Sequence, residues 1–213
     1  MIPRVWHVTW RSQTLPPDFR ANWGVIQSLH PKPRWDHRIW TDADISVLVD
    51  RHFPRRREAF DALPRQIMRV DIFRYMLMAI HGGVYSDLDV RMFKPLDPLL
   101  DDCTLLLAAE SDRVGDENFI AQHFMASAAG HPFWESLIAA ALDRPLDEIR
   151  AYADPLTTTG PAFVTRVWRG HAQHHGAKVL MRVIMCPPSI LGRPGLPVSP
   201  QSFGLHDCTG TWR

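Results

Sequence analysis

Two aspartates separated by one residue, Asp87 and Asp89, are the side chains of this sequence best suited to chemistry. In an extended segment such residues leave the chain on one side, so both carboxylates would share one space while Leu88 turns into the core. Neighbouring carboxylates repel each other unless a proton or a cation lies between them. Hard oxygen ligands of this kind suit a divalent metal ion. The pair therefore predicts a metal site, and the alternative is a solvated turn.

The residues before this pair predict how it is positioned. Pro64 suits the first turn of a helix, and neither Gly nor Pro follows it until residue 82. Gly82 and Gly83 predict the end of that helix, because glycine adopts a positive φ without a steric penalty. A short buried strand over residues 83–86 would then place both carboxylates at the carboxyl end of a strand, where open α/β sheets bind ligands.

Two charged residues of the predicted helix lie close to the same edge. Asp71 and Arg74 are spaced i and i+3, so they share one helix face. One interpretation is that they hold a ligand beside the aspartates, and the alternative is a surface ion pair worth roughly 0.2–0.5 kcal/mol. The glycine pair and the aspartates that follow favour the first interpretation.

Three short motifs occur together over residues 71–89: Asp-X-X-Arg-Tyr, Gly-Gly-Val-Tyr and Asp-X-Asp. This combination resembles the sugar-nucleotide-binding core of the Asp-X-Asp glycosyltransferases, in particular glycosyltransferase family 32. Residues 2–10 resemble the family's opening strand, Ile-Pro-Lys-Ile-Ile-His-Gln-Ile-Trp, and residues 205–212 resemble its His-X-X-X-Gly-Ser-Trp ending, with Thr211 in place of Ser. The resemblance spans most of the chain and is strong at residues 2–10, 71–99 and 205–212.

The resemblance implies a GT-A fold, which is an α/β fold with a Rossmann-like mixed sheet flanked by helices. Strands and helices are expected to alternate from the start of the chain, which agrees with this fold. A single domain over residues 1–213 is expected, because 213 residues, 46% of them hydrophobic, can bury one sizeable core. Strands are expected over residues 2–10, 34–40, 83–86, from 90, and over 103–110, 119–127 and 178–184, and further helices over 16–29, 42–52, 131–142 and from 160.

The resemblance also implies the ligands of the metal. Asp89 and His206 would hold Mn²⁺ or Mg²⁺, with Asp87 bound directly or through a water molecule. A mixed set of oxygen and imidazole ligands favours Mn²⁺. The residues expected to support catalysis are Asp71, Arg74, Asp87 and Asp89.

A nucleotide-sugar donor, UDP- or GDP-linked, is expected along the same edge. Asp71 and Arg74 would hold sugar hydroxyls, and Val8, Thr9 and Trp10 at the end of the first strand would approach the base. Core packing is the alternative for Trp10. The donor-binding set expected from the resemblance is Val8, Trp10, Asp71, Arg74, Tyr85, Asp87 and Trp212.

Three further segments bear on the site. Residues 157–161 resemble the family's Thr-Gly-Pro turn, and the helix start expected there suits an anionic or hydroxyl-rich ligand. Family members often carry Asn in the strand expected over residues 119–127, where this chain has Gln122 and His123, so no sugar contact is assigned to it. Residues 187–200 are rich in Pro and Gly, which predicts a loop over the site.

Charge and cysteine content limit the partners and the location. The net charge is +1, so no nucleic acid is expected as a partner. Three cysteines, odd in number and widely spaced, indicate reduced thiols and a cytoplasmic protein. No transmembrane segment is expected, because no apolar stretch has the length of a membrane span, so any contact with the inner face of the membrane would be peripheral. The run Arg55, Arg56 and Arg57 predicts a solvated face, with an anionic lipid or polysaccharide contact as the alternative.

The function expected is metal-dependent transfer of a sugar from the donor to a hydroxyl of a glycan, a lipid-linked or a protein acceptor, in polysaccharide or glycoconjugate synthesis. Family 32 members retain anomeric configuration, and no isolated carboxylate pair identifies a nucleophile and an acid as in glycosidases. One alternative is a metal-dependent nucleotide-sugar hydrolase or phosphoesterase, with water as the acceptor. The other is a non-catalytic module that binds a sugar nucleotide.

Overall fold

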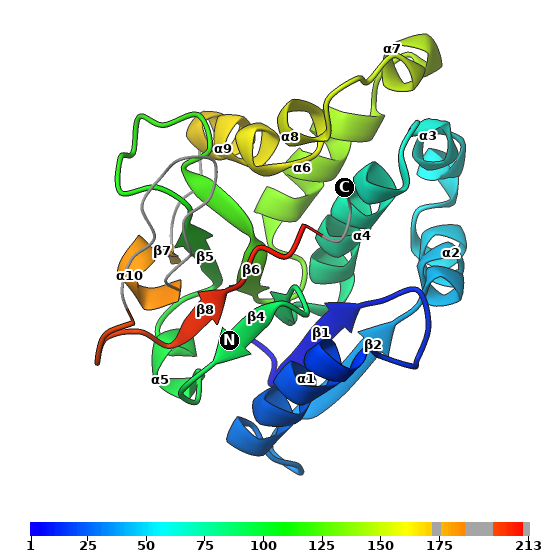
Figure 1. Cartoon of the computed structure of the whole chain (residues 1–213). Coiled ribbons are helices and arrows are strands. Elements are labelled where there is room, and N and C mark those ends of the chain that lie inside the picture. The colour runs from blue at the N-terminus through cyan, green and yellow to red at the C-terminus, as the bar shows by residue number, and fades with distance from the viewer. Residues whose placement is uncertain (172–175, 186–197, 211–213) are drawn as a thin grey trace.

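The computed structural model describes residues 1–171, 176–185 and 198–210. Its centre is a six-stranded sheet in the order β2-β1-β3-β6-β5-β7 (Figure 1). β1 is parallel to β2 and β3, β6 is antiparallel to β3 and β5, and β5 is parallel to β7, so the sheet is mixed. The strands are β1 (Val5–Thr9), β2 (Asp36–Trp40), β3 (Gly83–Ser86), β5 (Leu105–Ala109), β6 (Ile120–Ser127) and β7 (Ala177–Leu180).

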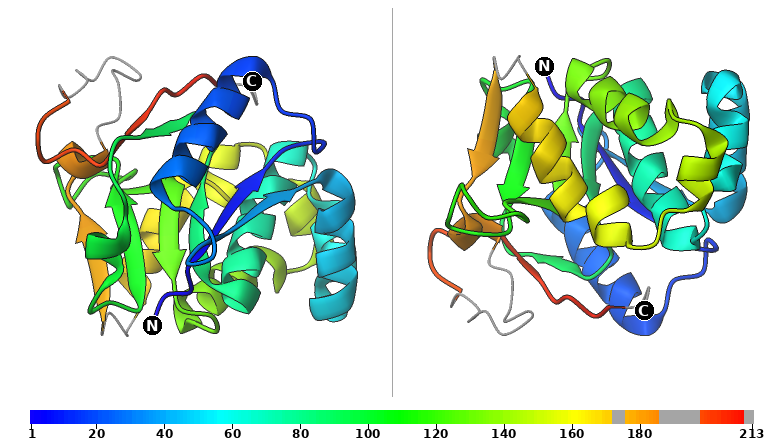
Figure 2. Two further views of the ribbon diagram at one scale, coloured as in Figure 1. Left: turned by 90° about the horizontal axis from the view of Figure 1, so that it is seen from below. Right: turned by 90° about the horizontal axis from the view of Figure 1, so that it is seen from above.

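Helices cover both faces of this sheet, with α1 on one side and α4, α6 and α9 on the other (Figure 2). The helices of the described residues are α1 (Pro17–Leu29), α2 (Asp42–His52), η1 (Pro54–Arg56), α3 (Arg57–Ala62), α4 (Gln66–His81), α5 (Asp97–Leu100), α6 (Pro132–Leu142), α7 (Leu146–Arg150), α8 (Pro155–Thr158), α9 (Pro161–Gly170) and α10 (Arg182–Met185).

Alternation along the strands divides the core into two apolar clusters. Leu106 and Ala108 of β5 pack into the cluster that includes α1, whereas Leu105 and Leu107 pack into the cluster that includes α4 and α6. Successive strand residues point to opposite faces, so each strand contributes to both clusters. The predicted α/β fold with a mixed sheet flanked by helices is confirmed.

The turn between α4 and β3 has the structure that its glycines predict. Gly82 has a φ of 59° and Gly83 a φ of 89°, both in the region that favours glycine. A Cβ atom on Gly82 would lie 2.4 Å from the backbone nitrogen of Ala129, so a larger residue does not fit. β3 starts directly after this turn and ends at Ser86, just before the first aspartate of the Asp-X-Asp motif.

Several element starts differ from the prediction by a few residues; β1, for example, begins at Val5 and not at residue 2. α4 begins at Gln66 and not at Pro64, because α3 forms a separate helix that ends just before Leu63, a fully buried residue. β2 begins at Asp36 and not at residue 34. Trp35 is instead buried among aromatic rings, and its indole N–H donates to Asp97 at 3.3 Å.

The strand predicted over residues 178–184 is wrong in its second half. β7 ends at Leu180, and α10 follows. The carbonyl groups of Val183 and Ile184 accept hydrogen bonds from Ser202 and Phe203, which are distant in sequence. A short apolar run fits a strand or a helix equally well, and tertiary contacts decide between them.

The strand predicted from residue 90 forms outside the main sheet. β4 (Val90–Met92) pairs antiparallel with β8 (Gly204–His206) in a sheet of two strands. Val90 lies opposite His206 in this pairing. The pairing therefore fixes the end of the described chain beside the Asp-X-Asp motif.

The basic run after α2 is occupied largely by ion pairs within the protein. Arg56 contacts the carboxylates of Glu135 and Asp143, and Arg57 contacts those of Asp50 and Asp61. These contacts favour the solvated face over an acceptor-binding surface. No helix in the described part of the chain is long and apolar enough to cross a membrane.

Candidate metal centre

Three side chains that can bind a metal meet at the carboxyl end of β3. Asp87, Asp89 and His206 each offer one ligand atom, and these atoms lie within 4.8 Å of one another. The backbone N–H of Asp87 donates to the carbonyl of His123 at 2.9 Å, which fixes the start of the motif against β6. The β4–β8 pairing brings His206 from the far end of the chain. The structure thus brings together the three residues predicted as metal ligands.

Asp89 is held by residues of the tail. Its Oδ1 lies 3.3 Å from Nε2 of His206, and its Oδ2 accepts the backbone N–H and the hydroxyl of Thr209, both at 2.9 Å. Burial favours the neutral acid, yet the hydrogen bonds from His206 and Thr209 hold the pKa of Asp89 well below its ordinary value. Asp89 is therefore ionised and attracts a cation.

His206 carries the positive charge of this arrangement. Burial alone would lower its pKa, but hydrogen bonds with Asp89 and Cys208 raise the pKa of His206 to about 10. The Sγ atom of Cys208 lies 3.1 Å from Nδ1, on the opposite side of the ring from Asp89. A metal ion bound to Nε2 must replace the proton there, because a metal ligand is a neutral imidazole.

Asp87 is the most open of the three ligands, with 31% of its side chain exposed. The hydroxyl of Tyr85 donates to its Oδ1 at 3.0 Å, and a guanidinium nitrogen of Arg74 lies 3.4 Å from the same oxygen. Arg74 also lies over the Tyr85 ring, 5.1 Å from its centroid. Tyr85, predicted to line the donor site, thus contacts the Asp-X-Asp motif directly.

Asp71 and Arg74 form a buried ion pair, so the alternative of a surface pair is wrong. Their side chains are 5% exposed each, and a guanidinium nitrogen lies 3.2 Å from Oδ1 of Asp71. Oδ2 of Asp71 accepts the hydroxyl of Thr159 at 2.8 Å, so both carboxylate oxygens have protein partners. Burial raises the pKa of Asp71, while Arg74 and Thr159 favour its charged form. In this geometry Asp71 acts on the site by holding Arg74, which in turn contacts Asp87.

A polar network behind this pair contains residues to which sequence reasoning assigned no role. The hydroxyl of Tyr75 donates to the carbonyl of Thr159 at 2.6 Å. The amide of Gln122 donates to the same carbonyl at 2.8 Å and also bonds the Tyr75 hydroxyl. Two signals pointed to these segments: the Thr-Gly-Pro resemblance at Thr159, and Gln122 in the strand where family members often carry Asn.

The residues predicted near the base occupy different environments. The Val8 side chain is fully buried in the core, so it offers no side-chain surface to a ligand. Trp10 is partly buried and packs edge-on against Phe19, with ring centroids 5.2 Å apart, which agrees with the packing alternative. Thr9 lies 3.0 Å from the Tyr85 hydroxyl and is thereby linked to the site. Trp212 and most of the loop predicted over residues 187–200 lie outside the described residues.

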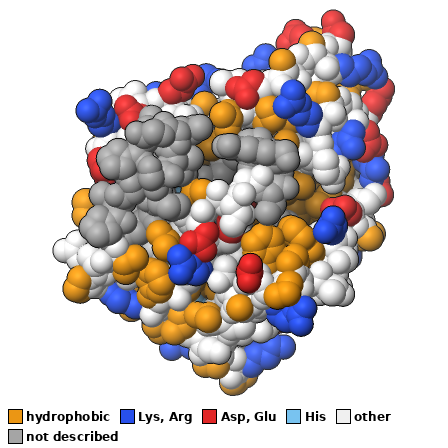
Figure 3. Space-filling model, viewed as in Figure 1, with side chains coloured by type: hydrophobic (Ala, Val, Ile, Leu, Met, Phe, Trp, Pro, Cys, Tyr) orange, Lys and Arg blue, Asp and Glu red, His pale blue; other side chains and the backbone are white. Residues whose placement is uncertain are grey.

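The charges and donor atoms of this site suit a divalent cation. The carboxylates of Asp87 and Asp89 meet the imidazole of His206, and Arg74, the permanent cation beside Asp87, is itself paired with Asp71. On the face shown in Figure 3, acidic side chains lie near the middle of the molecule, one beside a basic side chain, with hydrophobic and uncharged surface around them.

The sheet order, with the Asp-X-Asp motif at the carboxyl end of β3, is that of the GT-A fold. The structure of the PaToxG glycosyltransferase is similar with a TM-score of 0.58 and 14% identity, over 81% of this chain and 71% of that one. Mouse xyloside xylosyltransferase 1 is similar with a TM-score of 0.55 and 12% identity, over 98% of each chain. At these identities the likeness concerns the fold.

Sequence comparison agrees with the fold. Residues 17–106 match the family described as "Glycosyltransferase sugar-binding region containing DXD motif". Inositol phosphoceramide mannosyltransferases 3 and 1 of Schizosaccharomyces pombe are 28% and 27% identical to the chain, over 78% and 99% of it. These matches span 45% and 62% of the two relatives, so the chain corresponds to part of their length. The predicted GT-A fold is confirmed, and the predicted resemblance to Asp-X-Asp glycosyltransferases is confirmed over residues 17–106.

Proposed function

We propose that the protein is a metal-dependent glycosyltransferase that moves a sugar from a UDP- or GDP-linked donor to an acceptor hydroxyl. The observation that carries the proposal is the meeting of Asp87, Asp89 and His206 at the carboxyl end of β3. These residues would hold Mn²⁺ or Mg²⁺. When bound, that ion supplies positive charge to the diphosphate that leaves as the glycosidic bond breaks.

The other residues of the site have supporting roles in this proposal. Arg74 partly balances the charge of Asp87, and Asp71, which accepts the hydroxyl of Thr159, holds Arg74 in place. Tyr85 donates to Asp87 and so fixes its orientation. Asp71 and Asp89 are engaged by protein partners at both oxygens, so we assign neither as a covalent nucleophile and expect front-face attack with retention.

The relatives suggest the donor and the acceptor. Both Schizosaccharomyces pombe proteins are named as mannosyltransferases acting on inositol phosphoceramide. We therefore propose a mannosyl donor and a lipid-linked acceptor as the first pair to test, with glycan and protein acceptors next. We also propose a cytoplasmic location with access to the inner face of the membrane, since Cys103 and Cys208 are free thiols.

The test is a comparison of transfer with hydrolysis for the same sample. Purified protein is incubated with UDP- and GDP-sugars and Mn²⁺, with and without lipid and glycan acceptors and with excess chelator. We expect acceptor-dependent release of nucleoside diphosphate that chelator abolishes and Mn²⁺ restores. Turnover that is unchanged in excess chelator contradicts the metal role. Hydrolysis of the donor that is the same with and without every acceptor supports a nucleotide-sugar hydrolase. Donor binding without any turnover supports a non-catalytic module.

A further inference from the structure

A histidine outside the three metal ligands lies directly against one of them. The rings of His123 and His206 are stacked, with centroids 4.1 Å apart and planes inclined by 21°. The carbonyl of His123 also accepts the backbone N–H of Asp87 at 2.9 Å. One residue therefore contacts two ligands, Asp87 through the backbone and His206 through the ring.

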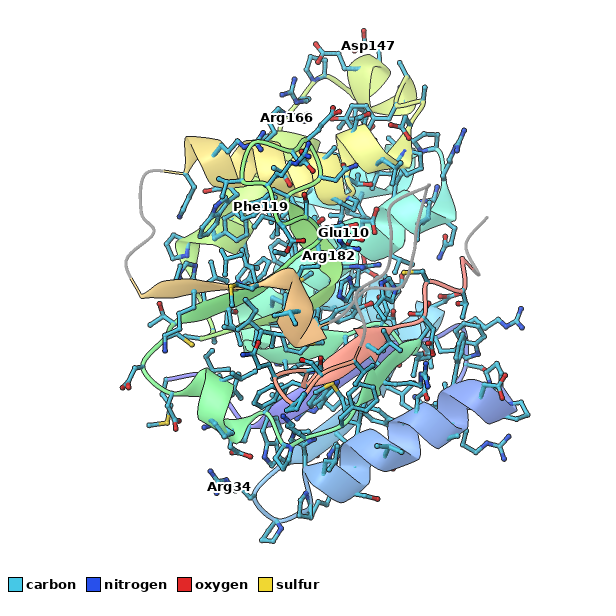
Figure 4. All side chains as sticks on the ribbon, turned by 60° about the vertical axis from the view of Figure 1, so that its left-hand side comes forward. Arg34, Glu110, Phe119, Asp147, Arg166 and Arg182 are labelled. Atoms are coloured by element: carbon cyan, nitrogen blue, oxygen red, sulfur yellow. The ribbon has the colours of Figure 1, made fainter. Side chains whose placement is uncertain are left out.

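The position of the His123 ring is fixed by its burial in the main sheet. It belongs to β6, which lies between β3 and β5 in the main sheet, and only 3% of the residue is exposed. Its Nδ1 lies 3.5 Å from a carboxylate oxygen of Glu110, which Figure 4 places near Arg182. At that distance the contact is long for a hydrogen bond, so burial in the sheet does most to hold the ring.

One ring nitrogen of His123 makes no contact that a substitution would break. Nε2 of His123 is buried and has no hydrogen-bond partner among the described residues, so replacing that nitrogen by carbon removes no bond.

His206, in contrast, has little local support. It is the last residue of β8, a strand of three residues outside the main sheet. Its hydrogen bonds to Asp89 and Cys208 hold the two nitrogens but leave the tilt of the ring weakly restrained. A metal must lie near the ring plane to meet the nitrogen lone pair, so this tilt governs affinity.

We propose that His123 is a positioning residue of the metal centre, whose buried ring fixes the plane of the His206 imidazole. The inference rests on the proposed function, because it concerns the same ligands. No local spacing links residues 123 and 206, and the stack exists because β6 and β8 are brought together by the fold. Supports of this kind typically change metal affinity by about 10–100-fold when removed.

The experiment compares His123→Ala with His123→Phe. Free Mn²⁺ is followed by electron paramagnetic resonance to give the dissociation constant for the metal alone, and thermal melts report folding. We expect His123→Ala to raise the dissociation constant at least about tenfold, and His123→Phe, which keeps a stacked ring, to stay within about threefold of wild type. His30→Ala is the control, because His30 is also buried and packs against aromatic rings, those of Trp6 and Trp35, and it should leave Mn²⁺ affinity unchanged.

A second readout needs no metal. The ring protons of His206 should carry a ring-current shift in nuclear magnetic resonance spectra that His123→Ala removes and His123→Phe preserves. If a folded His123→Ala variant binds Mn²⁺ as tightly as the wild type, the inference about His123 is wrong while the proposed function stands. The same holds if a folded His123→Phe variant binds Mn²⁺ as weakly as His123→Ala. Absence of Mn²⁺ binding by the wild type contradicts the proposed function as well, so the two failures are distinguishable.

Discussion

At the scale of the residue, the ligands differ in how firmly the protein already holds them. Asp89 is contacted at both carboxylate oxygens by His206 and Thr209, and its side chain is 12% exposed. Asp87 is more open and is contacted by Tyr85 and Arg74 at one oxygen. We therefore expect Asp89 to be the more sensitive of the two aspartates.

Asp89→Asn tests this expectation. The amide keeps the shape of the side chain but removes the charge from a proposed metal ligand, so turnover should fall at least about 100-fold. The protein should stay folded, with a melting temperature lowered by the loss of the ion pair with His206. Turnover with Mn²⁺ and circular dichroism melts are measured on one sample. Asp36→Asn is the control, because Asp36 is a half-exposed partner of Arg38. A variant with wild-type turnover, or one that is unfolded, contradicts the role assigned to Asp89.

The raised pKa of His206 predicts a pH dependence of metal binding. In the metal-free protein the ring remains protonated up to a pKa of about 10, against 6.5 for the free side chain. Its ion pair with Asp89 therefore stabilises the fold fully below pH 6.5, and this contribution is lost as the pH rises towards about 10. A metal at Nε2 must displace that proton, so Mn²⁺ affinity should rise up to tenfold per pH unit between about pH 6 and 8.

Calorimetric titration in buffers of different ionisation enthalpy measures the number of protons released. We expect close to one proton per Mn²⁺ ion in the wild type at neutral pH. His206→Asn should bind more weakly and release correspondingly fewer protons. Metal binding by the wild type that is independent of pH contradicts this assignment.

At the scale of the element, the segment from α4 through β3 to the Asp-X-Asp motif follows from sequence, because each step has a local cause. The glycine pair ends the helix, and the strand that follows carries the aspartates to its carboxyl end. The burial of Asp71 and Arg74 does not follow, since an i, i+3 spacing fixes a shared face but not what covers it. The role of His123 is equally hidden from sequence, because strand packing alone places it beside His206.

Gly82→Ala tests the turn that ends α4. The variant must adopt a φ of 59° and place its Cβ 2.4 Å from the Ala129 nitrogen, so it should lower the free energy of unfolding by at least about 2 kcal/mol. Gly24→Ala is the matched control, because Gly24 lies inside α1 with nothing within 4 Å of an added Cβ. The control should raise stability by about 0.5–1 kcal/mol. Urea unfolding of both variants and of the wild type measures the free energy of unfolding. Equal free energies for Gly82→Ala and the wild type contradict the steric argument.

At the scale of the whole molecule, the site is completed by segments that are distant in sequence. α4 supplies Arg74, the segment after β3 supplies the aspartates, and β8 supplies His206 (Figure 1). The sequence predicted this meeting only through the family resemblance of the tail, since no local pattern pairs β4 with β8. The contacts that join the described tail to the rest include the β4–β8 ladder, the bonds of Thr209 to Asp89, the stack of His206 on His123, and the ion pair of Asp207 with Arg91 at 2.7 Å.

Deleting residues 206–213 tests whether the tail serves the site or the core. The deletion removes His206 and Thr209, the partners of Asp89, but leaves both apolar clusters of the main sheet intact. We expect a folded protein whose melting temperature falls only by the loss of the contacts between Asp89 and the tail, with weaker Mn²⁺ binding and no detectable transfer. His206→Ala alone should reproduce most of the loss of Mn²⁺ affinity and transfer.

The alternative is that Trp212 only packs into the hydrophobic core, in which case the deletion will mainly lower the melting temperature. A folded truncation that transfers sugar at the wild-type rate contradicts the assignment of His206 to the metal.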